Sequence, residues 1–330
     1  MGYVKKHPVL GLALLLLSGM ASASATDPDP KTADTDESGM EVVLVLGQQP
    51  GPGLWKVTLG DHVMWILGEI SPYPRKVKWT SKRFERLLGN SQELLLDYSG
   101  FWRADHTDTR RLAMAEMLPQ GVQLKDVISP SLYAKFEATA RRFDARGLEE
   151  LRPFAATNRL VVSAMDSMDM KAFSARFTAA QLARKRHLKV TYFSAPELPF
   201  EDRLKNWQQD SNAVCLERLL ATIGDGGAGV RRLANAWSVG DIGALRQLVP
   251  TYSFSRDGFR SGECAAAMHG GERQAADYKR KRTRLWLNQA KRALRSNPRT
   301  MAVVPMSELF SSDGYLVALR AEGYEIEEPQ

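Results

Sequence analysis

Strand-like segments lie at both ends of this chain, and segments with helical periodicity fill the region between them. The strand-like runs are Glu41–Gly47, expected to be an edge strand, Leu54–Thr58, Val63–Leu67, Glu93–Tyr98, Thr300–Met306 and Tyr324–Glu327. From about residue 107 to residue 296, apolar side chains recur mostly at the spacing of helical turns, interrupted by a strand-like run at 188–193. This order predicts a mixed α/β fold, with a central sheet formed from N- and C-terminal strands and a largely helical middle.

The composition is that of an ordinary globular protein. Of the 330 residues, 44% are hydrophobic and 25% are charged, which suffices for one large domain or two small ones. The formal net charge is +7, but the basic residues are scattered, and the densest runs, 184–186 and 279–282, adjoin apolar helix positions. Basic side chains are not interleaved with aromatic ones, so we expect no nucleic-acid partner. Since the sequence has no internal repeat, residues 41–330 are expected to form one domain.

The first 25 residues have the pattern of a signal peptide. Two lysines precede an apolar core at Val9–Leu17, and the small residues ASASA follow, so cleavage is expected after Ala25. The core is too short to span a bilayer comfortably, and no later stretch is long and apolar enough to do so. Residues 26–40 are rich in Asp, Thr and Pro and are expected to be a disordered leader. We therefore predict a periplasmic or secreted protein, without a membrane span once the signal is removed.

The sequence contains two cysteines, Cys215 and Cys264. Because an oxidising compartment favours the pairing of an even set of cysteines, we predict a disulfide between them. Two separate buried thiols are the alternative. A tetrahedral zinc site needs four ligands, and two cysteines without a neighbouring pair of histidines do not supply them.

Polar side chains lie at or just beyond the ends of three strand-like runs. Ser71, Asp97 and Glu308 each occupy such a position, and Gly68 and Glu69 stand between the first of these runs and Ser71. Because the strands of an α/β sheet deliver their C-terminal ends to a common edge, where pockets form, we expect Ser71, Asp97 and Glu308 to converge. The direction of the Glu69 side chain is left open.

Five segments of the sequence, in order, carry a family resemblance. They are PGPGLWKVTLGDHVMWILGEISPYP, LPQGVQLKDVI, AWSVGD, RTRLW and DGYLVALRAEGYEIE. Together they resemble the TraB/GumN family, whose distant relatives include the Tiki metalloproteases and the ChaN and erythromycin-esterase-like proteins. The resemblance extends from about Gly51 to the C-terminus.

The resemblance implies a metal-dependent hydrolase or peptidase, whose site combines two Gly-x-x-His motifs, an acidic residue at a strand end and an Arg-Asn pair. The corresponding residues here are Gly68 and Ser71, Asp97, Arg282 and Thr283, and Pro305 and Glu308. Ser71 and Glu308 therefore replace the two histidines, while Thr283 replaces the asparagine and Pro305 the second glycine. Two imidazoles and a carboxylate can hold a divalent ion with one position open for water, and this chain lacks both imidazoles.

The function predicted from these substitutions is non-catalytic. None of the five histidines lies in a zinc-binding motif, so we predict a pseudoenzyme that binds an unknown envelope protein or peptide and holds no metal or other cofactor. The alternative is a hydrolase whose rebuilt site holds a divalent cation through oxygen ligands from Glu69, Ser71, Asp97 and Glu308. The candidate site residues are Ser71, Asp97, Glu308 and Arg282, and the surrounding pocket residues are Gly68, Glu69, Thr283 and Pro305.

Overall fold

The computed structural model describes residues 50–97, 106–171, 175–193, 199–208, 213–253 and 269–329, together with Cys264, Ala266 and three short strands nearer the N-terminus. These strands are β1 (Asp34–Thr35), β2 (Glu41–Val42) and β3 (Gly47–Gln48). β1 pairs with β2, and β3 pairs with β7 (Val77–Lys78). The predicted signal peptide, and all of the predicted leader except β1, lie outside the described residues.

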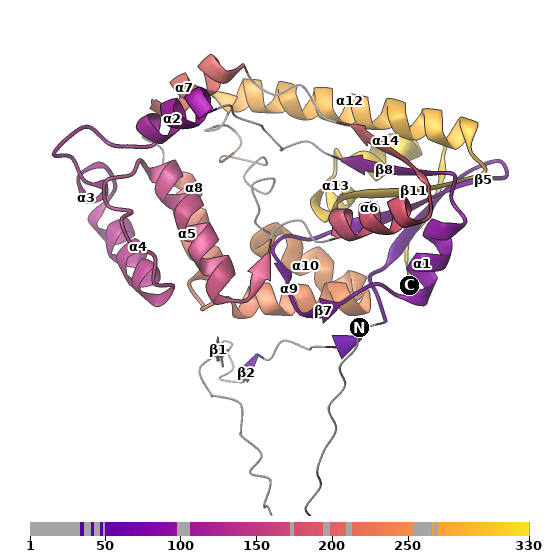
Figure 1. The fold of residues 1–330 in the computed structure, drawn as a ribbon, viewed down its shortest axis with the longest axis horizontal. Helices are drawn as coiled ribbons and strands as arrows, with labels where there is room; N and C mark the ends of the chain where they lie inside the picture. Colours follow the sequence, from indigo (N-terminus) through magenta and orange to yellow (C-terminus); the bar gives the residue numbers. More distant parts are fainter. Residues whose placement is uncertain are drawn as a thin grey trace, which may run out of the picture. The chain divides into compact units, whose positions relative to one another are not determined.

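A six-stranded sheet forms the centre of the fold (Figure 1). Its strands are β4 (Leu54–Leu59), β5 (His62–Glu69), β8 (Glu93–Asp97), β10 (Lys189–Phe193), β11 (Arg299–Pro305) and β12 (Glu325–Glu327). They lie side by side in the order β10-β8-β11-β5-β4-β12. β10, β8, β11 and β5 run parallel, and β4 and β12 add an antiparallel edge. The mixed α/β fold and the pairing of N- and C-terminal strands are therefore confirmed.

β11 is the strand that places the candidate residues at one edge. It pairs in parallel with β5 on one side, matching Val304 to Gly68, and with β8 on the other, matching Val303 to Leu96. Three parallel strands thus end side by side, as the sequence predicted. The side chains of β8 are buried along its whole length, because helices cover both faces of the sheet.

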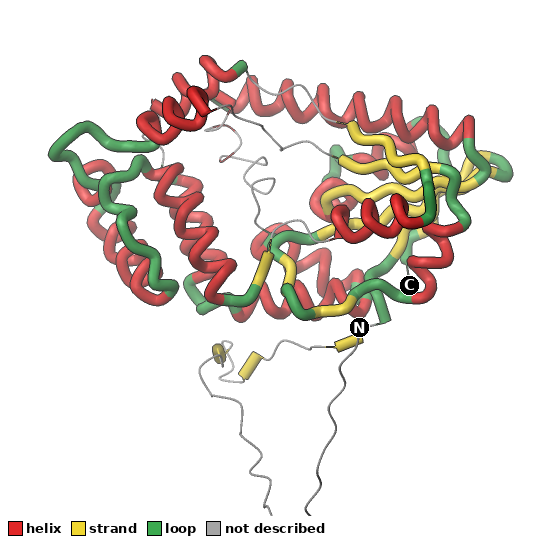
Figure 2. Tube along the Cα trace, viewed as in Figure 1, coloured by secondary structure: helices red, strands yellow, loops and turns green. Residues whose placement is uncertain are grey.

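The helices on the two faces come from different parts of the chain (Figures 1 and 2). On one face, α12 (Glu272–Ser296) runs along the sheet and packs against α14 (Tyr315–Ala321). On the other, α1 (Lys82–Gly89) and α6 (Ala175–Lys185) pack against the sheet and against each other. α13 (Met306–Phe310) continues directly from β11 and contacts α10 (Ile242–Tyr252). Large side chains such as Trp55, Trp237 and Trp286 fill the core around the sheet.

The middle of the chain is largely helical, as predicted, and has its own hydrophobic core. Its helices are α2 (His106–Ala115), α3 (Leu124–Val127), α4 (Pro130–Arg142), α5 (Pro153–Ser167), α7 (Phe200–Gln208), α8 (Val214–Ile223) and α9 (Ala228–Val239). Serine caps set some helix starts: the side chain of Ser129 accepts a hydrogen bond from the backbone of Leu132, and Pro130 follows it at the first helical position. A further short pair joins β6 (Tyr73–Pro74) to β9 (Met170–Lys171).

The predicted disulfide is confirmed. Cys215 lies near the start of α8, and its Cα atom lies 5.1 Å from that of Cys264, with the two sulfurs bonded. This distance falls in the usual range for a disulfide. Both residues are buried in the core of the helical region, so the bond joins two segments separated by 49 positions.

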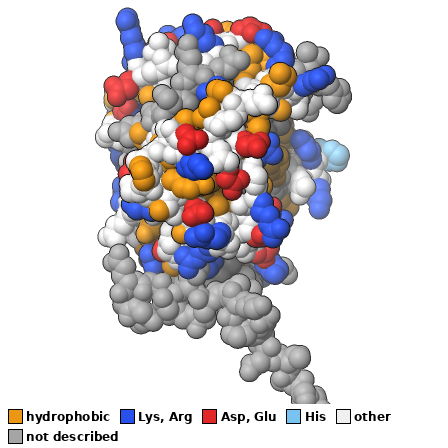
Figure 3. Space-filling view, turned by 90° about the vertical axis from the view of Figure 1, so that its left-hand side faces the viewer, with side chains coloured by type: hydrophobic (Ala, Val, Ile, Leu, Met, Phe, Trp, Pro, Cys, Tyr) orange, Lys and Arg blue, Asp and Glu red, His pale blue; other side chains and the backbone are white. Residues whose placement is uncertain are grey.

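The surface carries charges of both signs. Figure 3 shows a face on which Lys and Arg side chains are interspersed with Asp and Glu and with apolar groups, as the scattered basic residues of the sequence indicated. Within the part of the chain that the structure describes, no helix combines the length and the apolar character needed to span a membrane.

Candidate functional site

Asp97 and Arg282 form the centre of the candidate site. Asp97 is the last residue of β8 and is 1% exposed, and Arg282 reaches it from the middle of α12. The Nη2 and Nε atoms of Arg282 both donate to Oδ2 of Asp97, over 2.7 and 3.2 Å. The Tyr315 hydroxyl lies 3.5 Å from the same oxygen. The end of β8, where the resemblance predicts a site residue, therefore carries a buried ion pair.

Glu308 is the third member of this ion-pair group. It lies in the first turn of α13, which begins directly after β11, and its Oε1 atom accepts a hydrogen bond from Nη1 of Arg282 over 3.1 Å. Its other carboxylate oxygen, Oε2, is buried and has no hydrogen-bond partner in the described structure. One guanidinium thus joins two carboxylates that are 211 positions apart (308 − 97). We call Asp97, Arg282 and Glu308 the site triad.

Within the site triad, the opposite charges of the arginine and the two carboxylates stabilise one another. Burial alone would lower the pKa of Arg282, but the negative charges of Asp97 and Glu308, together with Tyr315, raise it well above its ordinary value. Burial also raises the pKa of the Tyr315 hydroxyl well above its usual range, although the Arg282 charge opposes this. Arg282 is therefore permanently charged, and the Tyr315 hydroxyl stays protonated as a possible donor toward Asp97.

A second buried ion pair adjoins the triad. Glu69, the last residue of β5, accepts hydrogen bonds from the backbone and the Nε atom of Arg176, in the first turn of α6. Glu69 is 5% exposed and Arg176 is 3% exposed. The Nη1 atom of Arg176 also donates to the backbone carbonyl of Asp97 over 2.8 Å. The two pairs therefore form one network of three carboxylates and two guanidiniums, with a formal charge of −1 (two positive, three negative).

Ser71 is buried near this network but is not joined to it. Its hydroxyl has no hydrogen-bond partner in the described part of the chain, and its backbone carbonyl accepts from the Ser253 hydroxyl over 3.3 Å. No described hydrogen bond or ion pair links Ser71 to Asp97, Arg282 or Glu308. The structure thus brings three of the four candidate residues together, and the role of Ser71 stays a prediction.

The four predicted pocket residues lie at the ends of β5 and β11 and on α12. Gly68 lies in close contact with α13, since a Cβ atom there would stand 2.6 Å from the sulfur of Met306. Its carbonyl accepts a hydrogen bond from the indole of Trp237 over 2.7 Å. Pro305 ends β11 and caps α13, and Thr283 is half-buried beside Arg282. Glu69, the fourth, belongs to the Arg176 pair.

Sequence reasoning missed Arg176. It lies among many arginines in a helical segment, and its residue type does not distinguish it from the exposed ones. One signal was available: Arg176 follows Ala175 and stands three and four positions before Ala179 and Ala180, so it lies on the small-residue face of α6 that packs against the sheet. A long charged side chain on such a face needs a buried partner.

The sequence of this chain matches the profile of the TraB/PrgY/gumN family over residues 53–328. This match covers most of the chain, including every strand of the central sheet and the whole network. The chain belongs to the TraB/PrgY/gumN family. The predicted family is thereby confirmed, while searches of curated proteins and of solved structures gave no match.

The site residues predicted from the family resemblance, apart from Ser71, lie in or beside the ion-pair network of this TraB/PrgY/gumN member. Two guanidiniums already contact the acidic side chains that could serve as metal ligands. Among the described residues, no group of three or more His, Cys, Asp or Glu side chains is arranged to hold a metal ion.

A separate charged cluster lies at the opposite end of β8 and was also missed from the sequence. Glu93, the first residue of that strand, is fully buried and accepts hydrogen bonds from Arg292, Thr191 and Asn297. Burial alone would raise the pKa of Glu93, but these hydrogen bonds lower it to about 2. The cluster ties α12 to the sheet at the edge away from the family positions.

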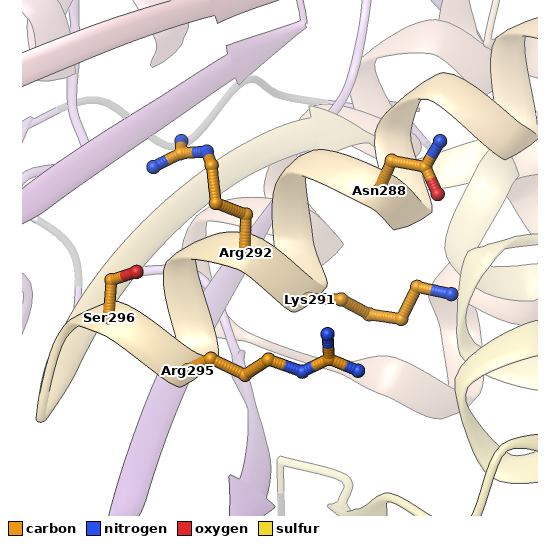
Figure 4. A pocket seen from close by; sticks show the side chains of 5 residues that line it. All are labelled: Asn288, Lys291, Arg292, Arg295 and Ser296. Atoms are coloured by element: carbon orange, nitrogen blue, oxygen red, sulfur yellow. The ribbon is translucent and has the colours of Figure 1, made fainter.

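A basic cavity of about 440 Å³ lies along the last turns of α12 (Figure 4). It is lined by Asn288, Lys291, Arg292, Arg295 and Ser296. Arg292 extends away from Lys291 and Arg295 and pairs with Glu93, and Lys291 pairs with Glu322 over 2.9 Å. Most of its positive charge is therefore already balanced within this TraB/PrgY/gumN chain.

Proposed function

We propose that this member of the TraB/PrgY/gumN family is an exported protein of the cell envelope that binds a partner and lacks metal-dependent peptidase activity. The observation that carries this proposal is the position of Arg282 between Asp97 and Glu308. A divalent cation at this edge would have to displace a guanidinium that already pairs with both carboxylates, or lie beside it and be repelled. The site therefore favours a fixed ion pair over an exchangeable metal.

Export is supported by two independent features of the chain. The first 25 residues have the pattern of a signal peptide, and the Cys215–Cys264 bond belongs to an oxidising compartment. Purification from periplasm or culture medium, followed by mass spectrometry, should give a mature chain that begins at or close to Thr26. A chain that keeps Met1 and stays in the cytoplasm would contradict export.

The second candidate function is a hydrolase that uses oxygen ligands at the same edge. Two buried oxygen atoms favour it, because Oε2 of Glu308 and Oγ of Ser71 lack hydrogen-bond partners in the described structure. Buried polar atoms of this kind are uncommon and can mark the place of a ligand or ion. A hard divalent cation would be the matching partner for these oxygens.

A metal titration of two variants separates the two functions. The wild-type chain and Arg282→Gln are titrated with Zn²⁺, Mn²⁺ and Mg²⁺ by calorimetry, and peptidase activity is assayed with and without chelator. We expect no tight binding and no activity in the wild type. Arg282→Gln should bind divalent cations more tightly than the wild type does, since it leaves Asp97 and Glu308 without their counter-charge.

Arg280→Gln, an exposed change on the same helix, is the control and should behave like the wild type. Stoichiometric metal that survives dialysis of the wild type, with activity lost on chelation, would establish the hydrolase instead.

A further inference from the structure

A cavity of about 450 Å³ is lined by α6, by the edge strand β10 and by its neighbour β8. It is lined by Leu96, Arg176, Phe177, Ala180, Gln181, Arg184 and Tyr192. Leu96 and Tyr192 are register partners on the two adjacent parallel strands, so their side chains share one face of the sheet. The volume lies at the lower end of the range for small-molecule pockets.

The walls of this cavity are mainly apolar. Leu96 and Ala180 are buried beneath it, whereas Phe177 and Tyr192 are 45% and 43% exposed. Aromatic side chains combine a large apolar surface with a fixed shape, and two of them beside a cavity are typical of a ligand site. The cavity can therefore take an apolar group against the two rings.

The charge at this cavity is positive. Nη2 of Arg184 donates to the hydroxyl of Tyr192 over 2.9 Å, a neutral partner. Across the described residues, no carboxylate lines the cavity or pairs with Arg184. Arg176 also lines the cavity, but Glu69 balances its charge. Arg184 is therefore placed to bind an anion, and its planar donor group suits a carboxylate.

We propose that this cavity binds a small apolar acid, that is, an acyl chain or an aromatic ring that carries a carboxylate. The carboxylate pairs with Arg184, and the apolar body packs against Phe177, Tyr192 and Leu96. This inference rests on the proposed function, since it names the ligand class of a binding protein. Because Arg176 lines the cavity and also holds Glu69 and the carbonyl of Asp97, the ligand lies directly beside the site network.

The chemistry of the lining favours a small acid over a peptide. A peptide would bring backbone N–H and C=O groups into the cavity, and these need hydrogen-bond partners when they are buried. The backbone N–H of Arg176 is used by Glu69, and the polar side chains are confined to Gln181, Tyr192 and the two arginines. An apolar body with one terminal charge matches this distribution.

Calorimetric titration of the full mature chain with three probes tests the proposal. Decanoate and naphthoate carry the carboxylate on an acyl chain and on an aromatic body, and decanol has the chain without the charge. We expect at least one acid to bind, and decanol to bind at least about tenfold more weakly than decanoate, which is the loss of one charge-assisted pair. If only decanoate or only naphthoate binds, the result identifies whether an acyl chain or an aromatic ring fits the cavity. Both results support the proposal.

Two variants locate the binding. Arg184→Gln should weaken acid binding by about tenfold or more and leave decanol unchanged, while Arg186→Gln, a nearby arginine outside the cavity, should change neither. Phe177→Ser should weaken acids and alcohol together, because it removes one apolar wall. Failure of both acids to bind, equal binding of decanol and decanoate, or an unchanged Arg184→Gln would overturn the proposal. Tighter binding of a peptide with an apolar C-terminus than of either acid would also overturn it.

The same samples keep this inference separate from the proposed function. Tight zinc binding with chelator-sensitive peptidase activity would overturn the non-catalytic function even if the acids bind as expected. Conversely, if neither acid binds and the chain also binds no zinc, only the proposed ligand class is contradicted, and the proposed function stands.

Discussion

Arg176 and Asp97 are joined through the main chain: Nη1 of Arg176 donates to the backbone carbonyl of Asp97 over 2.8 Å, whereas the side chain of Asp97 is held by Arg282. The two arginines come from α6 and α12, which cover opposite faces of the sheet. The end of β8 is therefore fixed from both faces at once. Because both arginines bind Asp97, substitution of either one should shift Asp97 and so alter the contacts of the other arginine.

Arg282→Leu should destabilise the fold by about 3–5 kcal/mol, because it leaves the buried carboxylates of Asp97 and Glu308 without a counter-charge. Chemical denaturation followed by circular dichroism measures the change. Lys281→Gln is the matched control, since the adjacent Lys281 makes an exposed pair with Asp277 and should matter little. Equal effects of the two changes would show that the triad contributes nothing beyond a surface pair.

Gly68→Ala should cost about 1–3 kcal/mol, because the new methyl group would stand 2.6 Å from the sulfur of Met306 and 2.8 Å from a methyl of Leu309. Both contacts are buried side chains of α13, so these side chains or the helix that carries Glu308 have to shift. Gly243→Ala, at an exposed position of α10 with space around it, should instead stabilise by about 0.5–1 kcal/mol. Thermal unfolding of both variants gives the comparison, and a neutral Gly68→Ala would contradict the close packing.

Glu93 should contribute to stability in a pH-dependent way. Its pKa is lowered from 4.5 to about 2 in the folded protein, so its contribution is fully present above pH 4.5 and is lost as the pH falls toward 2. The difference amounts to about 3 kcal/mol at most. Unfolding free energy measured between pH 6 and pH 2 should fall less steeply in Glu93→Gln than in the wild type. Parallel curves for the two proteins would refute this assignment.

The Cys215–Cys264 bond should stabilise the helical region. For a separation of 49 positions, the loop-entropy model gives about 4 kcal/mol. The paired substitution Cys215→Ala and Cys264→Ala should lower the free energy of unfolding by this order, and added reductant should destabilise the wild type but leave the paired variant unchanged. If reductant, added where it can reach the unfolded chain, leaves the free energy of unfolding of the wild type unchanged, the bond is contradicted.

The strand ends of the site could be predicted because their positions follow from periodicity and from topology. The apolar runs ending near Leu67, Asp97 and Met306 indicated where strands stop, and parallel pairing then brought those ends to one edge. Asp97 and Glu308 meet there for that reason, whereas Arg282, which reaches them from α12, was placed in the site by the family resemblance. The strand expected at 41–47 is not an edge of the central sheet, whose edges are β10 and β12. The described parts of that run pair with β1 and β7 instead.

The partners of the buried acids could not be predicted from sequence. Arg176 and Arg292 have the same residue type as many exposed arginines, and only the packing of α6 and α12 brings them to Glu69 and Glu93. Ser71 has the opposite outcome: its place after β5 was clear, but its hydroxyl makes no described contact with the triad. Side-chain direction beyond a strand end depends on loop geometry that periodicity does not encode.

The strand order has a consequence for the way this chain is made. β11 is the described strand that joins β5 to β8, yet it consists of residues 299–305, close to the C-terminus. While the ribosome is still adding those residues, the hairpin of β4 and β5 and the pair of β8 and β10 have no shared neighbour. Contacts this far apart along a chain form late in folding. The central sheet is therefore completed only after residues 299–305 have been made, 106 positions beyond the end of β10 (299 − 193).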